Sequence, residues 1–205
     1  MRGIKTTTLT IAFAMLVMVV LWLLGTQSAQ AAKPEGFDQL SERVQSRWDE
    51  GEQLLDLDWE DLIPEGFRAD AVLDQYDPEK IALLTDDDPL ILEIMEKLQK
   101  AYQSAPVLGV IDSMPVRLGG YIVPIEVTPE GITEFLLVPY FGACIHTPPP
   151  PSNQIVFVKT DTPVQESELY NAVWVSGRLS VETENTDLAT AGYTLYSEHI
   201  VPIEY

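Results

Sequence analysis

The only cysteine of the chain, Cys144, lies two residues before His146, which is one of only two histidines. In an extended backbone, side chains two residues apart point to the same face. A thiolate and an imidazole are suitable ligands for zinc or copper, and the same pair can supply the nucleophile and the base of a thiol enzyme. A single cysteine cannot form an internal disulfide, so the thiol is either buried or takes part in binding or catalysis.

A metal centre needs more ligands than this pair. The other histidine, His199, and the carboxylate of Glu126 lie in β-rich segments and are the remaining candidates, with zinc as the candidate cofactor. The alternative is a thiol-dependent hydrolase or transferase, in which Cys144 is the nucleophile and His146 or His199 the base. A structural role, with Cys144 buried, is also open. Because nearby carboxylates raise the pKa of a thiol, the sequence favours a non-enzymatic protein.

The segment around the pair is predicted to be rigid. An apolar strand precedes it, Gly142 allows the backbone to turn, and four consecutive prolines follow. Prolines fix the backbone as a stiff extended arm, which can dock into an aromatic groove at low entropic cost. We therefore expect the segment to contact a partner protein through Tyr140, Phe141, Pro148, Pro149, Pro150, Pro151, Asn153 and Gln154.

Short apolar runs predict that the elements around this segment are mainly strands. Runs rich in Val, Ile, Leu and aromatic residues, separated by Gly, Pro, Asp or Ser turns, occupy residues 107–111, 116–118, 121–127, 134–139, 154–159, 172–179 and 193–203. One clear helix precedes all of them, because Asp88 is a good N-cap and apolar residues then recur at helical spacing as far as Tyr102. We expect that apolar stripe to belong to the core. The pattern predicts an α+β, mainly β fold with a small antiparallel OB-like barrel, or alternatively a β-sandwich.

The N-terminal residues resemble a secretory signal peptide. Arg2 and Lys5 precede an uncharged apolar stretch from Leu9 to Leu24, and Ala29-Gln30-Ala31 fits a cleavage site. We therefore expect a signal peptide at 1–31, a helical N-terminal arm at 32–68 laid on the main domain by its tryptophans, and a single α+β domain with a β-barrel core at 69–205. The expected location is periplasmic or secreted, with no stable membrane anchor once the signal peptide is removed.

The charge of the chain excludes several partners. Without residues 1–31, ten basic residues face 32 acidic ones, a net formal charge of −22. Nucleic acids and anionic membrane surfaces would be repelled, whereas metal cations or a basic partner protein would be attracted. The sequence also contains no phosphate-binding loop, dinucleotide fingerprint or paired Cys-x-x-Cys motif, which excludes the common classes of nucleotide-dependent enzyme.

The run Val-Pro-Tyr-Phe-Gly-Ala-Cys-Ile-His-Thr-Pro-Pro-Pro-Pro-Ser-Asn-Gln resembles an uncharacterised family of secreted bacterial proteins, domain of unknown function 3299. Gly-Tyr-Ile-Val-Pro-Ile-Glu and the Leu-x-Trp-x-x-Leu-Ile-Pro arm also resemble this family, and the similarity extends from about Trp59 to Val201. The resemblance implies an envelope protein, associated in some members with ABC-type export or lipoprotein transport and in others with zinc-responsive genes. We therefore expect a binding or accessory protein of envelope transport, whose partner is an ABC-type transporter component and which handles zinc through the Cys-x-His loop. The resemblance assigns no catalytic residue.

Overall fold

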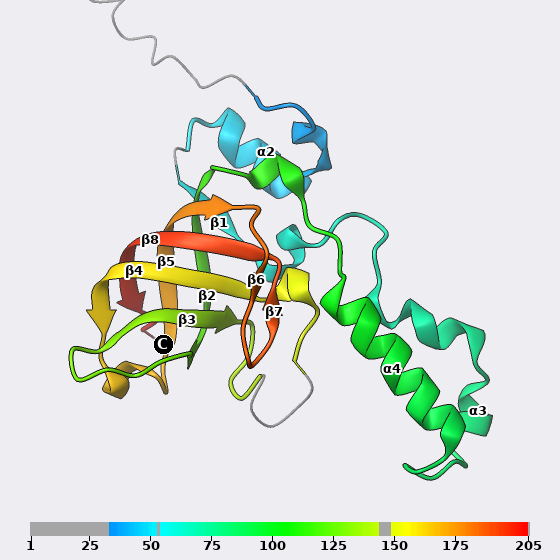
Figure 1. Ribbon diagram of the computed structural model, residues 1–205. Helices are drawn as coiled ribbons and strands as arrows, with labels where there is room; N and C mark the ends of the chain where they lie inside the picture. Colours follow the sequence, from blue (N-terminus) through cyan, green and yellow to red (C-terminus); the bar gives the residue numbers. More distant parts are fainter. Residues whose placement is uncertain (1–32, 53, 144–148, 205) are drawn as a thin grey trace, which may run out of the picture. The chain divides into compact units, whose positions relative to one another are not determined.

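Five strands close into a barrel in the computed structural model, which describes residues 33–52, 54–143 and 149–204. They are β2 (Pro115–Pro124), β3 (Ile132–Val138), β4 (Val156–Val164), β5 (Ala172–Ser180) and β8 (Tyr193–Pro202) (Figure 1). Their order is β2-β3-β4-β8-β5, and β5 pairs back with β2. This is the order of an OB-fold, so the predicted OB-like barrel is confirmed and the β-sandwich is not formed. The pairing of β4 with β8 is parallel, which the all-antiparallel prediction missed.

The main core fills the barrel because alternate residues of each strand point inward. In β2, Val116 and Leu118 are buried, while Arg117 between them is only half-buried on the outer side. β2 is one continuous strand, although the sequence predicted two separate runs at residues 116–118 and 121–127. Gly120 lies where an added Cβ would come within 2.7 Å of the Val138 carbonyl oxygen, so its missing side chain allows β3 to approach β2.

The N-terminal arm is part of the barrel's core and sheet. It comprises η1 (Phe37–Gln39), α2 (Glu42–Asp49), β1 (Leu55–Leu57) and η2 (Trp59–Leu62), and β1 pairs in parallel with β2. The arm buries six apolar side chains in the main core: Phe37, Leu40, Val44, Leu55, Leu57 and Leu62. The indole of Trp59 also donates a hydrogen bond to the Gly119 carbonyl at 2.8 Å. The described residues from Glu35 onward therefore form one compact unit.

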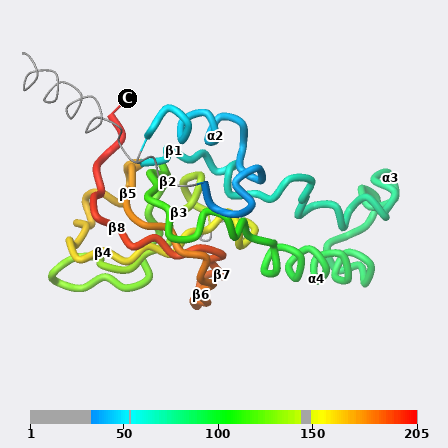
Figure 2. The backbone as a smooth tube through the Cα atoms, turned by 90° about the horizontal axis from the view of Figure 1, so that it is seen from above, coloured from blue at the N-terminus to red at the C-terminus, as the bar shows by residue number. Residues whose placement is uncertain are grey.

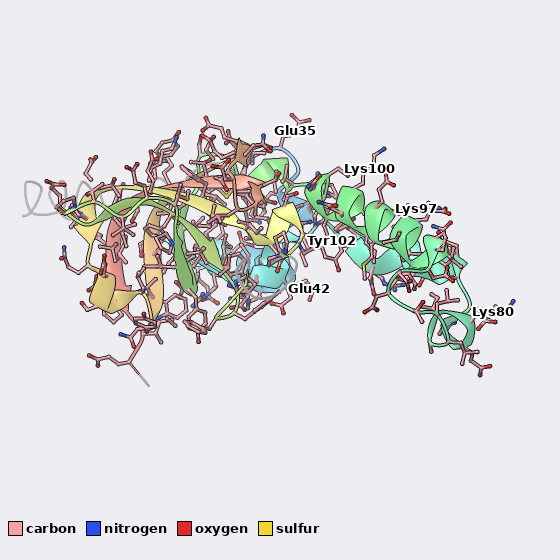
Figure 3. The ribbon with its side chains drawn as sticks, turned by 60° about the horizontal axis from the view of Figure 1, so that its bottom comes forward. Glu35, Glu42, Lys80, Lys97, Lys100 and Tyr102 are labelled. Carbon is pink, nitrogen blue, oxygen red and sulfur yellow. The ribbon has the colours of Figure 1, made fainter. Side chains whose placement is uncertain are left out.

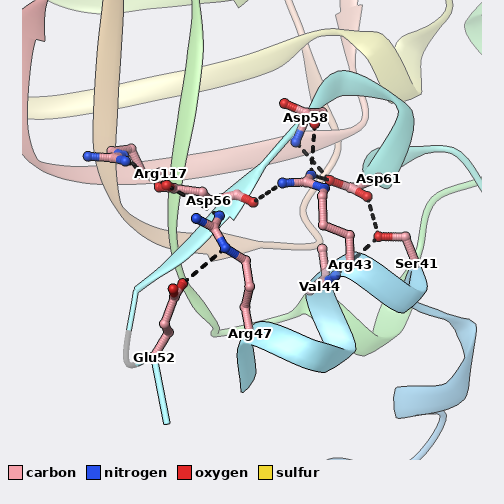
Figure 4. A network of polar contacts seen from close by, with 9 residues as sticks. All are labelled: Ser41, Arg43, Val44, Arg47, Glu52, Asp56, Asp58, Asp61 and Arg117. Carbon is pink, nitrogen blue, oxygen red and sulfur yellow. Dashed lines mark hydrogen bonds and ion pairs between the residues drawn. The ribbon is translucent and has the colours of Figure 1, made fainter. Parts of the chain in front are cut away.

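A buried carboxylate ties the arm together. Asp61 accepts hydrogen bonds from the Ser41 hydroxyl at 2.6 Å and from the Asp58 backbone N–H at 2.8 Å, and it forms an ion pair with Arg43 (Figure 4). Because each carboxylate oxygen has a donor, the cost of burying this charge is offset. The network joins the first turn of α2 to the start of η2.

The helical segment between the arm and the barrel is largely exposed. It consists of η3 (Ala69–Gln75), α3 (Pro78–Ile81) and α4 (Pro89–Gln103), and it extends away from the barrel in both ribbon and tube views (Figures 1 and 2). The N-cap prediction is confirmed, since the Asp88 carboxylate accepts a bond from the Leu90 N–H at 2.8 Å. The prediction that the apolar stripe of this helix is core is wrong, because only Ile94 of α4 is buried.

Two further differences concern the connections. Residues 107–111, predicted as a strand, form a buried loop that ends in the 3-10 turn η4 (Gly109–Ile111). The β5–β8 connection contains a small hairpin of β6 (Glu184–Asn185) and β7 (Thr190–Ala191), which the sequence did not predict. The remaining 3-10 turns are η5 (Ser152–Gln154) and η6 (Glu166–Glu168). Within the described ranges, no helix has the length and apolar character needed to cross a membrane.

Candidate functional site

The loop between β3 and β4 contains most of the residues predicted to be functional. Cys144, His146 and Pro148 lie outside the described residues, so their predicted metal, catalytic and partner roles stay predictions. On the near side of that segment, Gly142 has a φ of 83° and Ala143 is fully buried. A φ in this range favours glycine, which explains the glycine at the turn.

The far side of the loop is anchored by the turn η5. The Asn153 amide donates to the Pro106 carbonyl at 2.9 Å, and the Gln154 amide donates to the Trp59 carbonyl at 2.7 Å. The backbone carbonyl of Ser152 accepts a bond from the Gly192 N–H at 2.7 Å. Asn153 is completely buried, and these three bonds hold this end of the loop against the arm, the segment after α4 and the residue before β8. A partner would reach Pro149 and Pro151, which are half-buried, more readily than Asn153.

A second hydrophobic cluster covers the outer face of the barrel next to this loop. Leu136 and Val138 of β3 and Phe157 of β4 point outward into it, while their sequence neighbours point into the main core. Ala143 from the loop and Ala191 from β7 close the cluster. OB-folds commonly bind oligonucleotides or oligosaccharides on the face formed by their second and third strands, which here are β3 and β4. In this protein its own loop and hairpin cover part of that face.

Three aromatic rings from separate elements meet beside the loop, and we call Tyr121, Phe141 and Tyr170 the aromatic cluster. The ring centroids of Tyr121 and Phe141 are 5.9 Å apart in an edge-on arrangement, and those of Phe141 and Tyr170 are 6.5 Å apart. Such pairs are more favourable than their buried area alone implies. Phe141 is nevertheless 59% exposed and Tyr170 is 76% exposed, so the cluster presents an ordered apolar surface to solvent.

The outer side of β2 and β5 presents a fourth aromatic residue, Trp174. A Cβ added to Gly119 would come within 2.9 Å of the Trp174 ring, so the glycine lets this ring lie close against β2. The Arg117 guanidinium lies 5.0 Å from the ring centroid and forms two hydrogen bonds of 2.5 Å with Asp56. These bonds raise the pKa of Arg117 above its ordinary value. Because Asp56 pairs this cation, Arg117 is a poor candidate for binding a substrate carboxylate.

The two other predicted metal ligands lie in different elements. His199 is exposed on β8, opposite Ser176 of β5, and Glu126 follows β2 in the turn toward β3. Among the residues that the structure describes, no three His, Cys, Asp or Glu side chains form a group able to hold a metal ion. A site built from Cys144, His146, His199 and Glu126 therefore stays a prediction.

The sequence identified Tyr140 and Phe141 but not the two tyrosines that complete the cluster. Tyr121 could have been found, because it follows Arg117 and Gly119 at period two on the outer face of the same strand. Tyr170 gave no signal, because it lies in the connection after η6 and meets Phe141 only through the tertiary fold.

Residues 59–202 match the profile of a family described as "Protein of unknown function (DUF3299)". The crystal structure of a DUF3299 family protein from Pseudomonas aeruginosa PAO1 is similar, with 43% sequence identity and a TM-score of 0.58. The match covers 74% of this chain and 97% of that chain. No curated protein matches the chain. Because the family profile spans more than half of the sequence, the chain belongs to the DUF3299 family.

Proposed function

We propose that this protein is a non-enzymatic binding protein of the bacterial cell envelope, which engages a partner protein of envelope transport through the aromatic cluster. The observation that carries the proposal is the position of Phe141. Its ring is mostly exposed, yet it contacts two other aromatic rings, those of Tyr121 and Tyr170.

Ordered, exposed aromatic residues are well suited to bind a partner. Interfaces obtain most of their binding energy from a few aromatic or arginine residues that fill pockets on the other protein. A ring that is already fixed loses little conformational entropy on binding. Tyr140, 48% exposed and next to Phe141, extends the apolar surface.

The anchoring of the loop adds to this argument. Ala143 is buried on one side of the loop, and Ser152 and Asn153 are buried on the other. Phe141 of the aromatic cluster therefore lies in a loop whose described ends are buried against the barrel. This arrangement presents a surface in one orientation, as an accessory protein that docks on an ABC-type transporter component requires.

A matched pair of substitutions tests the proposal. Phe141→Ala removes the centre of the aromatic cluster, whereas Tyr196→Ala removes an aromatic ring of similar exposure on the β8 side of the barrel. We expect the tagged wild-type chain and Tyr196→Ala to co-purify the same envelope protein, and Phe141→Ala to lose at least 90% of it. Equal recovery with all three chains would refute the proposal. Circular dichroism of each variant checks that its fold is retained.

Zinc handling is a second proposal, and it rests on Cys144 and His146 with His199 and Glu126 as further ligands. It is supported by the exposed position of His199 and by the fixed ends of the loop that carries the Cys-x-His pair. Protein purified without chelator should contain about one zinc ion per chain. Both Cys144→Ser and His146→Ala should lose that zinc. Wild-type protein that is purified without metal and does not bind added zinc would contradict the proposal.

The thiol-enzyme alternative has a different signature. A catalytic Cys144 would have a depressed pKa and would react quickly with iodoacetamide near pH 6. A thiol that reacts only after the protein has been unfolded would exclude this alternative and favour a structural cysteine.

A further inference from the structure

A groove lies where α4, the prolines of the β3–β4 loop and the β6–β7 hairpin meet. Its volume is about 470 Å³, and its walls include Met95, Tyr102, Pro149, Pro150 and Leu188. The lining thus combines apolar side chains with polar ones such as Gln99 and Asp187, from three separate segments, and binding grooves commonly join apolar walls to polar groups. It contains no member of the aromatic cluster.

The helical segment that forms one wall of the groove carries further exposed apolar side chains. Met95 is 58% exposed, Leu92 is 59% exposed and Leu83 in the α3–α4 connection is 85% exposed. Leu92 and Met95 lie three residues apart on α4 and therefore share one face of the helix. Exposed apolar side chains that lie together often mark an interaction site, because leaving them in water is unfavourable.

The helical segment carries a net negative charge. Residues 68–103 contain nine acidic and four basic residues, a net formal charge of −5, and Arg68 forms ion pairs with Asp70 and Asp74. Figure 3 labels the lysines of this segment, Lys80, Lys97 and Lys100. The Lys97 ammonium donates to Glu93 at 2.6 Å and to the Tyr76 hydroxyl at 2.9 Å, and the bond to Glu93 is the main cause of its raised pKa. Lys97 therefore neutralises the charge of Glu93, and the net negative charge of the segment comes from its other acids.

We propose that the groove and the exposed face of α4 form a second docking surface, whose occupant is a basic amphipathic helix of a partner protein. Its apolar side chains would contact Leu92, Met95 and Leu188, and its lysines or arginines would face the surrounding acids. A helix of 15 residues such as α4 is roughly 22 Å long, so four turns of a partner helix match its length.

Charge selects this occupant over the alternatives. A second copy of the chain would bring another segment of charge −5 against the first, which is repulsive. Nucleic acid and anionic lipid would be repelled for the same reason. A helix with an apolar stripe and basic flanks would cover the exposed leucines with its stripe and pair its basic side chains with the acids. Helix-in-groove recognition usually works in this way.

The test uses the full chain and two synthetic peptides of 18 residues. One has leucines along one helical face and lysines elsewhere, and the other has the same leucine pattern with glutamates in place of lysines. We expect the Leu/Lys peptide to bind, with an affinity that falls as salt is raised, and the Leu/Glu peptide to bind at least tenfold more weakly.

A double variant separates docking from general attraction to an acidic protein. Leu92→Ser with Met95→Ser removes exposed apolar side chains while leaving every charge in place, and it should weaken binding of the Leu/Lys peptide at least tenfold. Tyr196→Ser replaces an exposed aromatic side chain on β8 and should leave binding of the Leu/Lys peptide unchanged. The inference is overturned if the double variant binds the Leu/Lys peptide as tightly as the wild type. Phe141→Ala should bind the peptide normally, so this result is independent of the aromatic cluster.

Discussion

At the scale of single residues, glycines determine how closely the barrel strands approach one another, because a glycine has no side chain. Gly177 lies at a β-bulge, where the register between β5 and β8 shifts. A Cβ at this position would lie 2.1 Å from the Tyr196 carbonyl oxygen, which is a backbone atom and cannot rotate away. The bulge therefore depends on this glycine.

We expect Gly177→Ala to destabilise the protein by about 1–3 kcal/mol, because the strands must separate to admit the methyl group. The matched control is Gly109→Ala, since a Cβ at Gly109 meets nothing within 4 Å. Urea unfolding followed by circular dichroism measures both. Equal stability of the two variants would show that the bulge tolerates a side chain.

The phenol of Tyr193 couples stability to alkaline pH. It is fully buried, it donates to the Leu62 carbonyl at 2.8 Å, and it accepts a bond from the Leu108 N–H at 2.7 Å. Burial raises the pKa of Tyr193 from 10.0 to about 12, because the charged phenolate is disfavoured in the core.

The folded protein therefore holds this proton more tightly than the unfolded chain. The stabilisation is complete below pH 10 and is lost as the pH rises from 10 toward 12. We expect the unfolding free energy to fall over this range, and to fall less steeply in Tyr193→Phe than in the wild type. Tyr170→Phe, which changes an exposed phenol, should keep the wild-type slope. A Tyr193→Phe slope identical to that of the wild type would contradict the assignment.

At the scale of elements, α4 gains little stability from packing against the barrel. Only Ile94 is buried, and the half-buried Asp88 side chain caps the first turn. A helix with so few buried contacts opens locally, without global unfolding.

Removing the cap should therefore affect α4 alone. We expect Asp88→Ala to lower the free energy of opening of α4 by about 1 kcal/mol, as loss of an N-cap usually does. Hydrogen exchange should show faster exchange of the α4 amides with unchanged protection of β2 and β5. If the melting temperature of the barrel falls together with α4 protection, the two elements are coupled more tightly than their contacts indicate.

The elements that the sequence predicted correctly are those with a clear local pattern of apolar residues. The strands at residues 134–139, 154–159, 172–179 and 193–203 correspond to β3, β4, β5 and β8, and the Asp88-capped helix corresponds to α4. The unbroken apolar run of β3 has a physical reason, because Phe135 and Leu137 enter the main core while Leu136 and Val138 enter the second cluster.

The errors arise where tertiary contacts decide the outcome. The apolar run at 107–111 is buried without being a strand, because burial alone does not require strand pairing. The stripe on α4 correctly predicted a helix, but a stripe does not reveal whether a partner covers it. Phe141 was identified from its position in the loop, whereas Tyr170 joins it only through the folded chain.

At the scale of the whole molecule, the β3–β4 loop connects two exposed surfaces. Phe141 at its start belongs to the aromatic cluster, and Pro149 and Pro150 near its end line the groove beside α4. The same loop carries the Cys-x-His pair between them in sequence. A protein with this arrangement is suited to hold a partner in a defined orientation.

Site-specific crosslinking in living bacteria tests the central proposal most directly. A photoreactive phenylalanine analogue at position 141 or 170 should give the same discrete adduct with one envelope protein, and the analogue at position 196 should not give it. The Phe141→Ala substitution should reduce the adduct formed from position 170. Crosslinking that is absent at positions 141 and 170, or identical at all three positions, would contradict the proposal that the aromatic cluster binds a partner.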